Sequence, residues 1–155
     1  MSQGKLFNNQ RDHVAIMTPI WGLIPKIIKG EKIVESRWYM NKTAPWDNIF
    51  AGDRIYFKDS GGPITVRAEV GRVRQLENLN PNKVKDLLYR IAKDDGLGRN
   101  KKVLDGFYER FRDKKYVILI ELKNPIEIDQ FEINKSGFGA MTAWITVNDI
   151  SKIKK

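Results

Sequence analysis

The segment YVILIEL, residues 116–122, constrains the fold more than any other part of the chain. Its apolar side chains occupy both alternating positions, which is typical of a strand buried on both faces. It is much shorter than the ~20 residues that a helix needs to cross a bilayer. The segment therefore predicts a central strand of a globular sheet, with other elements packed on both sides.

Several other short segments carry the two-residue alternation of strands. Residues 64–73 alternate apolar and polar side chains until Gly71, where the apolar face resumes out of phase and indicates a β-bulge. The turn sequence SGGP at residues 60–63 precedes this strand, and Asn124-Pro125 is expected to end the apolar one. Further strands are expected at residues 13–17, 33–39, 54–58, 126–133 and 143–147.

Two parts of the chain show the spacing of amphipathic helices instead. Thr18 and Pro19 predict the start of the first helix, and Gly30 predicts its end. Pro25 lies inside this helix and is expected to kink or split it. The second part is a helical excursion over residues 80–113 that holds two helices. The apolar stripe of the first helix consists of Ile20, Leu23, Ile24, Ile27 and Ile28.

Strands therefore flank two helical parts, and most connections are short. Closing short, twisted strands on themselves removes exposed sheet edges. The pattern predicts an α+β fold, a small mixed β-barrel with flanking helices. One domain is expected over residues 12–155, preceded by a mobile leader at residues 1–11, because a chain of this length can bury its own core.

The charge balance favours a polyanionic partner. The chain carries 28 Lys and Arg residues against 19 Asp and Glu residues, a formal net charge of +9. Such an excess most often serves nucleic-acid binding, although it can also serve only solubility. The chain has no cysteine, which excludes disulfides, thiolate metal sites and cysteine nucleophiles. Its acidic residues are scattered among turn formers, so we expect neither a metal ion nor a cofactor.

The same features bear on location. The polar residues at the start of the chain show no export signal, and no apolar segment has the length of a membrane span. No basic amphipathic helix of the kind that lies on membranes is visible either. We therefore expect a cytoplasmic protein without membrane contact, and the oligomeric state stays open.

One motif points to a family. Residues 30–37 read GEKIVESR, the pattern G-x-K-x-x-E-x-R, between a predicted helix and a predicted strand. This segment resembles the signature of the ASCH domain, a branch of the PUA-like barrel superfamily. Residues 51–57 (AGDRIYF) resemble a further strand of that family, and the resemblance covers about residues 14–122. It implies a PUA-like pseudo-barrel, with the related EVE and YTH barrels as alternatives.

The resemblance implies a basic cleft that binds RNA or a nucleotide-like ligand, with the signature on its rim. Strand alternation independently places Glu35 and Arg37 on one face, ~6.6 Å apart, and Lys32 at the strand entry can reach them. Together these three side chains could grip a phosphate and a base edge. The alternative is a structural ion pair that fixes the strand.

Aromatic and basic residues complete the expected site. Trp46, in the polar loop KTAPWDN, is the best candidate for an exposed stacking ring, whereas Trp38 shares a strand face with Val34 and can equally belong to the core. Trp21 and Trp144 are expected in the core. The predicted ligand-binding residues are Lys32, Glu35, Arg37, Tyr39, Lys42, Trp46, Lys58, Arg67, Arg72 and Arg74.

The resemblance also implies a catalytic alternative. Small bacterial relatives hydrolyse acylated nucleosides, and a metal-independent ribonuclease activity is suggested for others. At the matching positions this chain has Lys32 and Asp95, but Glu35 stands where the hydrolases have a threonine. A lysine beside a buried acid can have a lowered pKa and act as a base, so these three residues are the catalytic candidates. His13 is expected to be structural, and a protein-interaction module is the third alternative.

Overall fold

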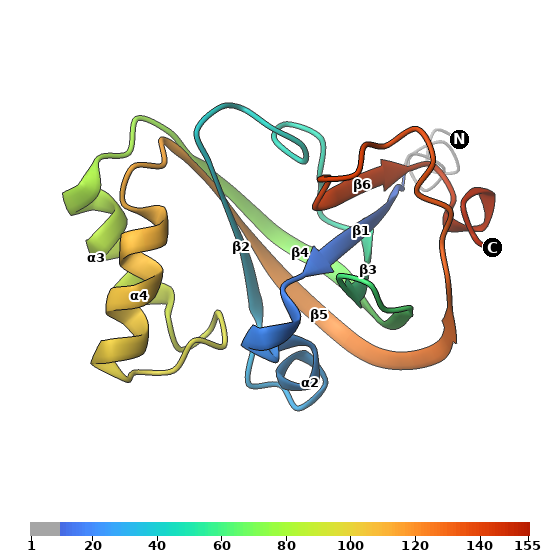
Figure 1. The fold of residues 1–155 in the computed structure, drawn as a ribbon, viewed down its shortest axis with the longest axis horizontal. Coiled ribbons are helices and arrows are strands. Elements are labelled where there is room, and N and C mark those ends of the chain that lie inside the picture. Colours follow the sequence, from blue (N-terminus) through green and yellow to red (C-terminus); the bar gives the residue numbers. More distant parts are fainter. Residues whose placement is uncertain (1–9) are drawn as a thin grey trace, which may run out of the picture.

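The computed structural model describes residues 10–155, so residues 1–9 of the predicted leader lie outside the described part. The strands are β1 (Asp12–Met17), β2 (Val34–Tyr39), β3 (Arg54–Asp59), β4 (Ile64–Leu76), β5 (Tyr116–Phe131) and β6 (Trp144–Val147). They form one sheet in the order β2-β5-β4-β3-β1-β6, with β1 and β3 parallel and the other neighbours antiparallel. The sheet curls into a half-barrel (Figure 1), which confirms the predicted small mixed α+β barrel.

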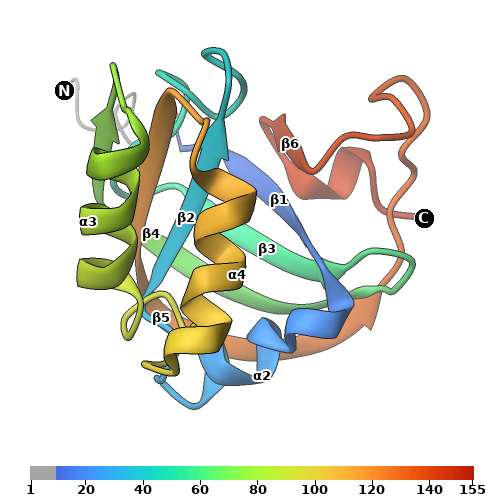
Figure 2. The same ribbon diagram turned by 60° about the vertical axis from the view of Figure 1, so that its left-hand side comes forward.

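The helices fall into the two predicted parts. The 3-10 helix η1 (Pro19–Trp21) and the helix α2 (Leu23–Ile28) connect β1 to β2, whereas α3 (Pro81–Ile91) and α4 (Lys101–Phe111) connect β4 to β5. A second 3-10 helix, η2 (Ile150–Lys152), follows β6. Figure 2 shows α3 and α4 side by side against the part of the sheet that contains β2. No helix within residues 10–155 is long and apolar enough to cross a membrane.

Bulges bend the two longest strands. The pairing of β4 with β5 shifts register around Gly71, as predicted, and again between Arg67 and Glu69. Such bulges increase the local twist and let the sheet curl. The predicted break at Asn124-Pro125 was wrong, because β5 continues through both residues to Phe131. Since β2 pairs with β5 only up to Glu121, Pro125 lies where that side of β5 has no strand neighbour.

The first helical part differs from the prediction. It splits at Gly22, which adopts a left-handed conformation with φ of 60°, and Pro25 is accommodated in the first turn of α2. The Thr18 side chain makes no capping hydrogen bond. The split also breaks the predicted stripe, because the Ile20 side chain is 88% exposed while Ile27 is fully buried. The segment between β1 and α2 is therefore not buried in the core, and its residues Thr18 and Trp21 line a pocket.

Most buried apolar side chains form one large cluster, and a smaller one lies beside β1, β3 and β6. The stripe of α3, represented by Leu88, is buried in the large cluster as its spacing predicted. Trp38 and Trp144 are buried there too, which confirms the core assignment of Trp144. Trp21 is only partly buried at the edge of this cluster, contrary to the prediction, and its free side lines the pocket described below.

Candidate binding pocket

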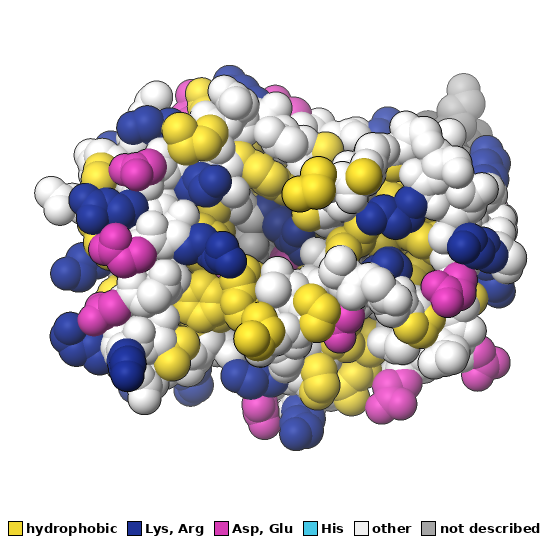
Figure 3. Space-filling model, in the orientation of Figure 1, with side chains coloured by type: hydrophobic (Ala, Val, Ile, Leu, Met, Phe, Trp, Pro, Cys, Tyr) yellow, Lys and Arg dark blue, Asp and Glu magenta, His cyan; other side chains and the backbone are white. Residues whose placement is uncertain are grey.

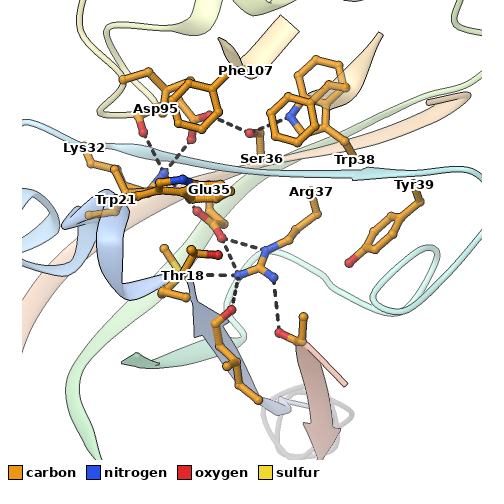
Figure 4. Close-up of a pocket in the computed structure, with 16 residues that line it drawn as sticks. Thr18, Trp21, Lys32, Glu35, Ser36, Arg37, Trp38, Tyr39, Asp95 and Phe107 are labelled. Carbon is orange, nitrogen blue, oxygen red and sulfur yellow. Dashed lines mark hydrogen bonds and ion pairs between the residues drawn. The ribbon is translucent and has the colours of Figure 1, made fainter. Parts of the chain in front are cut away.

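A pocket of about 240 Å³ opens at the edge of the half-barrel. Residues of β1, η1, β2 and α4 line it, together with Asp95 after α3 and Ala143 before β6. Figure 3 shows a recess near the centre of this face, with charged side chains deep inside it and hydrophobic ones around it. Figure 4 shows that the motif residues of β2 point into the same space as Trp21 and Phe107. The sequence motif and two remote segments therefore meet at one site.

Lys32 is the most enclosed charged group of the pocket. Its side chain is only 1% exposed. The Nζ atom donates to the backbone oxygens of Val34 (2.7 Å) and Asp95 (2.9 Å). It also lies 2.5 Å from Asp95 Oδ1 and 3.0 Å from Glu35 Oε1. Because protein oxygens already surround the ammonium group, Lys32 has no donor left for a phosphate.

Arg37 connects the pocket to the opposite edge of the sheet. Its Nε and Nη2 atoms both lie 2.7 Å from Glu35 Oε2, which confirms that strand alternation places the two residues on one face. Its guanidinium group also donates to the carbonyl of Ala143 at 3.3 Å and lies 5.1 Å from the centre of the Trp144 ring. β2 and β6 are the two sheet edges within the described residues, so this side chain spans the gap between them.

The ion pairs shift the pKa values of Lys32 and Glu35 in opposite directions. Burial alone would lower the pKa of Lys32, but the carboxylates of Asp95 and Glu35 outweigh it and raise that pKa. Burial alone would raise the pKa of Glu35, but Lys32 and Arg37 hold it below its ordinary value. The expectation that Lys32 has a lowered pKa and acts as a base was therefore wrong.

Asp95 is the acid whose pKa is raised. Burial raises the pKa of Asp95, and the nearby charge of Glu35 adds to the shift, so Lys32 only partly offsets it. The Ser36 hydroxyl donates to Asp95 Oδ2 at 2.6 Å, and the indole of Trp38 donates to the Ser36 oxygen at 3.0 Å. Asp95 therefore takes up a proton more readily than an ordinary aspartate.

Aromatic rings form the rest of the wall. The Trp21 ring meets Phe107 edge-on at 5.0 Å, and Trp38 stacks on Phe111 at 5.1 Å with an angle of 8° between the planes. Tyr39 also lines the pocket. Such rings offer flat apolar faces to a planar ligand. The sequence did not point to these rings as pocket residues, because Trp21 was expected in the core and the helical spacing of Phe107 and Phe111 is equally typical of core residues.

The remaining predicted residues do not line this pocket. Lys42 lies 5.8 Å from the Trp46 ring, which packs edge-on against Tyr116 at 5.3 Å, so this loop forms a separate aromatic cluster. Lys58 is buried and has no ion pair among residues 10–155, and its burial lowers the pKa of its amine. The other three lie along β4: Arg67 is partly buried, and Arg72 and Arg74 are exposed.

The loop that carries Asp95 depends on a glycine. Gly96 has φ of +81°, and a Cβ atom there would lie 3.0 Å from the Cβ of Lys32. Gly98 has φ of +76° but nothing within 4 Å of such an atom. Both alanine variants incur the cost of a left-handed residue, about 1–2 kcal/mol. We expect Gly96→Ala to lose about 1 kcal/mol more than Gly98→Ala in urea unfolding. Equal losses would contradict the tight packing of Lys32 against this loop.

The comparisons with known proteins concern the fold. No protein-family model and no curated protein matched the chain. The ASCH protein from Zymomonas mobilis has a TM-score of 0.59 at 14% identity, with 88% of this chain and 87% of that chain covered. A point mutant of it gives 0.59 at 12% identity, with 89% and 91% covered. A second mutant gives 0.59 at 13% identity, with 90% and 89% covered.

Fold and site together define a small α+β pseudo-barrel with a pocket at its open edge. Its fold is similar over most of the chain to the structures from Zymomonas mobilis. The fold is that of the ASCH domain, as the G-x-K-x-x-E-x-R motif predicted.

Proposed function

We propose that the protein binds RNA or a nucleotide-like ligand by inserting a base into this pocket. The observation that carries the proposal is the combination of aromatic walls with a polar floor in a space of about 240 Å³. Trp21 and Phe107 provide the rings, and Ser36, Glu35 and Asp95 provide polar atoms that can meet a base edge. The net charge of +9 and the ASCH fold support a nucleic-acid ligand.

The motif residues have a different role here from a phosphate grip. Lys32 and Arg37 are already paired with Asp95 and Glu35, so they fix the carboxylates in place. Each carboxylate oxygen has two lone pairs, and the ion pairs do not use all of them. The free lone pairs can accept hydrogen bonds from the amino group of a base. The pocket therefore favours bases that carry an exocyclic amino group.

Two tryptophan variants test this proposal. Trp21→Ala removes a ring that lines the pocket, and Trp46→Ala removes one from the separate aromatic cluster. A stacked base contributes about 1–3 kcal/mol, so we expect Trp21→Ala to weaken binding at least fivefold. Affinities for the four nucleosides, their monophosphates and short RNAs are measured by calorimetry, and quenching of tryptophan fluorescence gives a second readout.

The control variant decides where the ligand lies. Trp46→Ala should leave the affinity within about twofold of the original protein. If Trp46→Ala weakens binding and Trp21→Ala does not, the ligand lies at the loop that the sequence suggested, and the pocket proposal fails. If no nucleoside, nucleotide or RNA binds to the original protein, the proposed function itself fails.

Hydrolysis of an acylated or modified nucleoside, or of RNA, is the second candidate. The observation that favours it is the 2.6 Å hydrogen bond from the Ser36 hydroxyl to Asp95, whose pKa is raised. Asp95 would take a proton from water or from Ser36 as that oxygen attacks an acyl carbonyl, and would pass the proton to the nucleoside atom that leaves as its bond to the acyl carbon breaks. If Ser36 attacks, water would then hydrolyse the acyl ester on Ser36 and release the acid. Release of free acid, or of cut strands from labelled RNA, would be the signal. Ser36→Ala should abolish it if Ser36 is the nucleophile, and an inactive original protein rejects this candidate.

A further inference from the structure

The floor of the pocket has little positive charge to offer. Its two cations, Lys32 and Arg37, face the two carboxylates of Glu35 and Asp95 at 2.5–3.0 Å. The Arg37 side chain is also only 12% exposed. A phosphate placed there would have to displace these ion pairs and would lie beside two acids. A nucleotide that enters base first therefore has its phosphate at the mouth of the pocket, where a different cation is needed.

Arg110 of α4 lies over the ring of Trp21, one of the residues that line the pocket. Its guanidinium carbon is 5.3 Å from the centre of the Trp21 ring, which lines the pocket. The residue is exposed, and no carboxylate within the described residues 10–155 lies within ion-pair distance of it. Phe107, one helical turn earlier, packs edge-on against the same ring. The contact with Trp21 therefore holds an exposed cation, unpaired among the described residues, beside a wall of the pocket.

The chemistry of the guanidinium group suits this position. A guanidinium group that stacks on an aromatic ring uses its flat face, and its N–H groups stay free in the plane. Those N–H groups match the geometry of two phosphate oxygens. Arg112, two residues further along the chain, provides a contrast. It lies over Tyr108 at 5.5 Å and pairs with Glu109 at 3.5 Å, and neither of these residues lines the pocket.

We propose that Arg110 contacts the phosphate of the bound ligand, so that the site takes a nucleotide, with its base inside and its phosphate at the mouth, in preference to a free nucleoside. This proposal rests on the proposed function of the pocket. It names the ligand class more narrowly, because it adds a second recognition point outside the base-binding space. It also assigns that point to α4, a helix outside the sequence motif.

The test compares each nucleoside with its 5′- and 3′-monophosphates by calorimetry. The proteins are the original chain, Arg110→Gln and Arg112→Gln. We expect the better monophosphate to bind the original protein about two- to fivefold more tightly than the nucleoside, the range that exposed ion pairs give. Arg110→Gln should remove this difference while keeping the affinity for the nucleoside. Arg112→Gln should retain it. Raising the salt concentration should reduce the difference in the original protein.

The outcomes distinguish the phosphate contact of Arg110 from the base-binding pocket on which it depends. Equal affinities for nucleoside and monophosphate in the original protein would overturn the role of Arg110 but leave the base pocket intact. Equal effects of Arg110→Gln and Arg112→Gln would also overturn it, because they would indicate a general effect of charge. Absence of binding for every nucleoside and nucleotide would instead reject the base pocket. Both arginines are partly or fully exposed, so both variants are expected to fold.

Discussion

Replacing Lys32 with methionine is expected to destabilise the protein by about 3–5 kcal/mol, the usual result of removing one partner of a buried ion pair. Methionine fills much of the space of the lysine stem but leaves Glu35 and Asp95 buried without their shared cation. Urea unfolding at neutral pH, followed by tryptophan fluorescence, measures the loss. Lys29→Met is the matched control, because Lys29 is exposed in the same segment and should change stability by less than about 0.5 kcal/mol.

The pH dependence gives this prediction a second readout. In the original protein the low pKa of Glu35 gives a stabilising contribution that is present at neutral pH and is lost as the pH falls through that pKa. The raised pKa of Asp95 acts in the opposite direction, because its contribution is lost as the pH rises through that pKa. In Lys32→Met, burial and mutual repulsion should raise the carboxylate pKa values above those of the unfolded chain. That variant should therefore gain more stability than the original protein as the pH falls from 7 to about 5. A variant that behaves like Lys29→Met at every pH would contradict the buried ion network.

Asp53→Asn is expected to cost about 3 kcal/mol, because buried groups that lose their partners cost about 1–3 kcal/mol each. Asp53 accepts hydrogen bonds from His13 Nε2 (2.8 Å) and the Phe50 amide (3.0 Å) on one oxygen, and from the Arg11 amide (3.2 Å) on the other. An asparagine has one oxygen, so its NH₂ group must face one of these N–H donors. These bonds also hold the pKa of Asp53 below its ordinary value although burial opposes the shift. The difference in the free energy of unfolding between the original protein and Asp53→Asn should therefore become smaller in acid.

His13 supplies the spectroscopic test of the same prediction. The Trp144 indole donates to His13 Nδ1 at 3.1 Å, so the hydrogen of the neutral ring lies on Nε2 and points to Asp53. His13 is the single histidine of the chain, and NMR of its ring nitrogens should report this tautomer in the original protein and a change in Asp53→Asn. Asp47→Asn, at an exposed position nearby, should alter neither the ring signals nor the stability. An unchanged tautomer with full stability in Asp53→Asn would contradict this hydrogen-bond chain.

The sequence predicted what depends on local periodicity. Strand side chains repeat every two residues, and this alternation placed Glu35 and Arg37 on one face of β2. In β4 the apolar positions change phase at Gly71, which marked the bulge there. The cap of α3 is equally local, since the Asn80 side chain accepts from the amide of Lys83, three residues further on. The break at Asn124-Pro125 failed because its effect depends on whether a neighbouring strand needs the missing N–H group.

The chemistry of the site depends on contacts that no local pattern encodes. Asp95 lies 63 positions from Lys32 in the chain, and their contact reverses the pKa shift that burial alone would give the lysine. Trp21 and Phe107 meet because η1 and α4 pack at the same edge of the sheet. A helical stripe predicts that such residues are apolar, but it cannot say which of them faces a pocket rather than the core.

The gap that Arg37 spans has a consequence for how proteins of this fold diversify. Where backbone hydrogen bonds close a barrel, its opening changes only if residues are inserted or removed. Here one side chain makes the connection, with bonds to Glu35 and to the carbonyl of Ala143. A single substitution at the position of Arg37 can change the width or the charge of the entrance while the hydrogen bonds between the strands stay intact. Paralogues with the same scaffold can thus acquire different ligand preferences by point substitution alone.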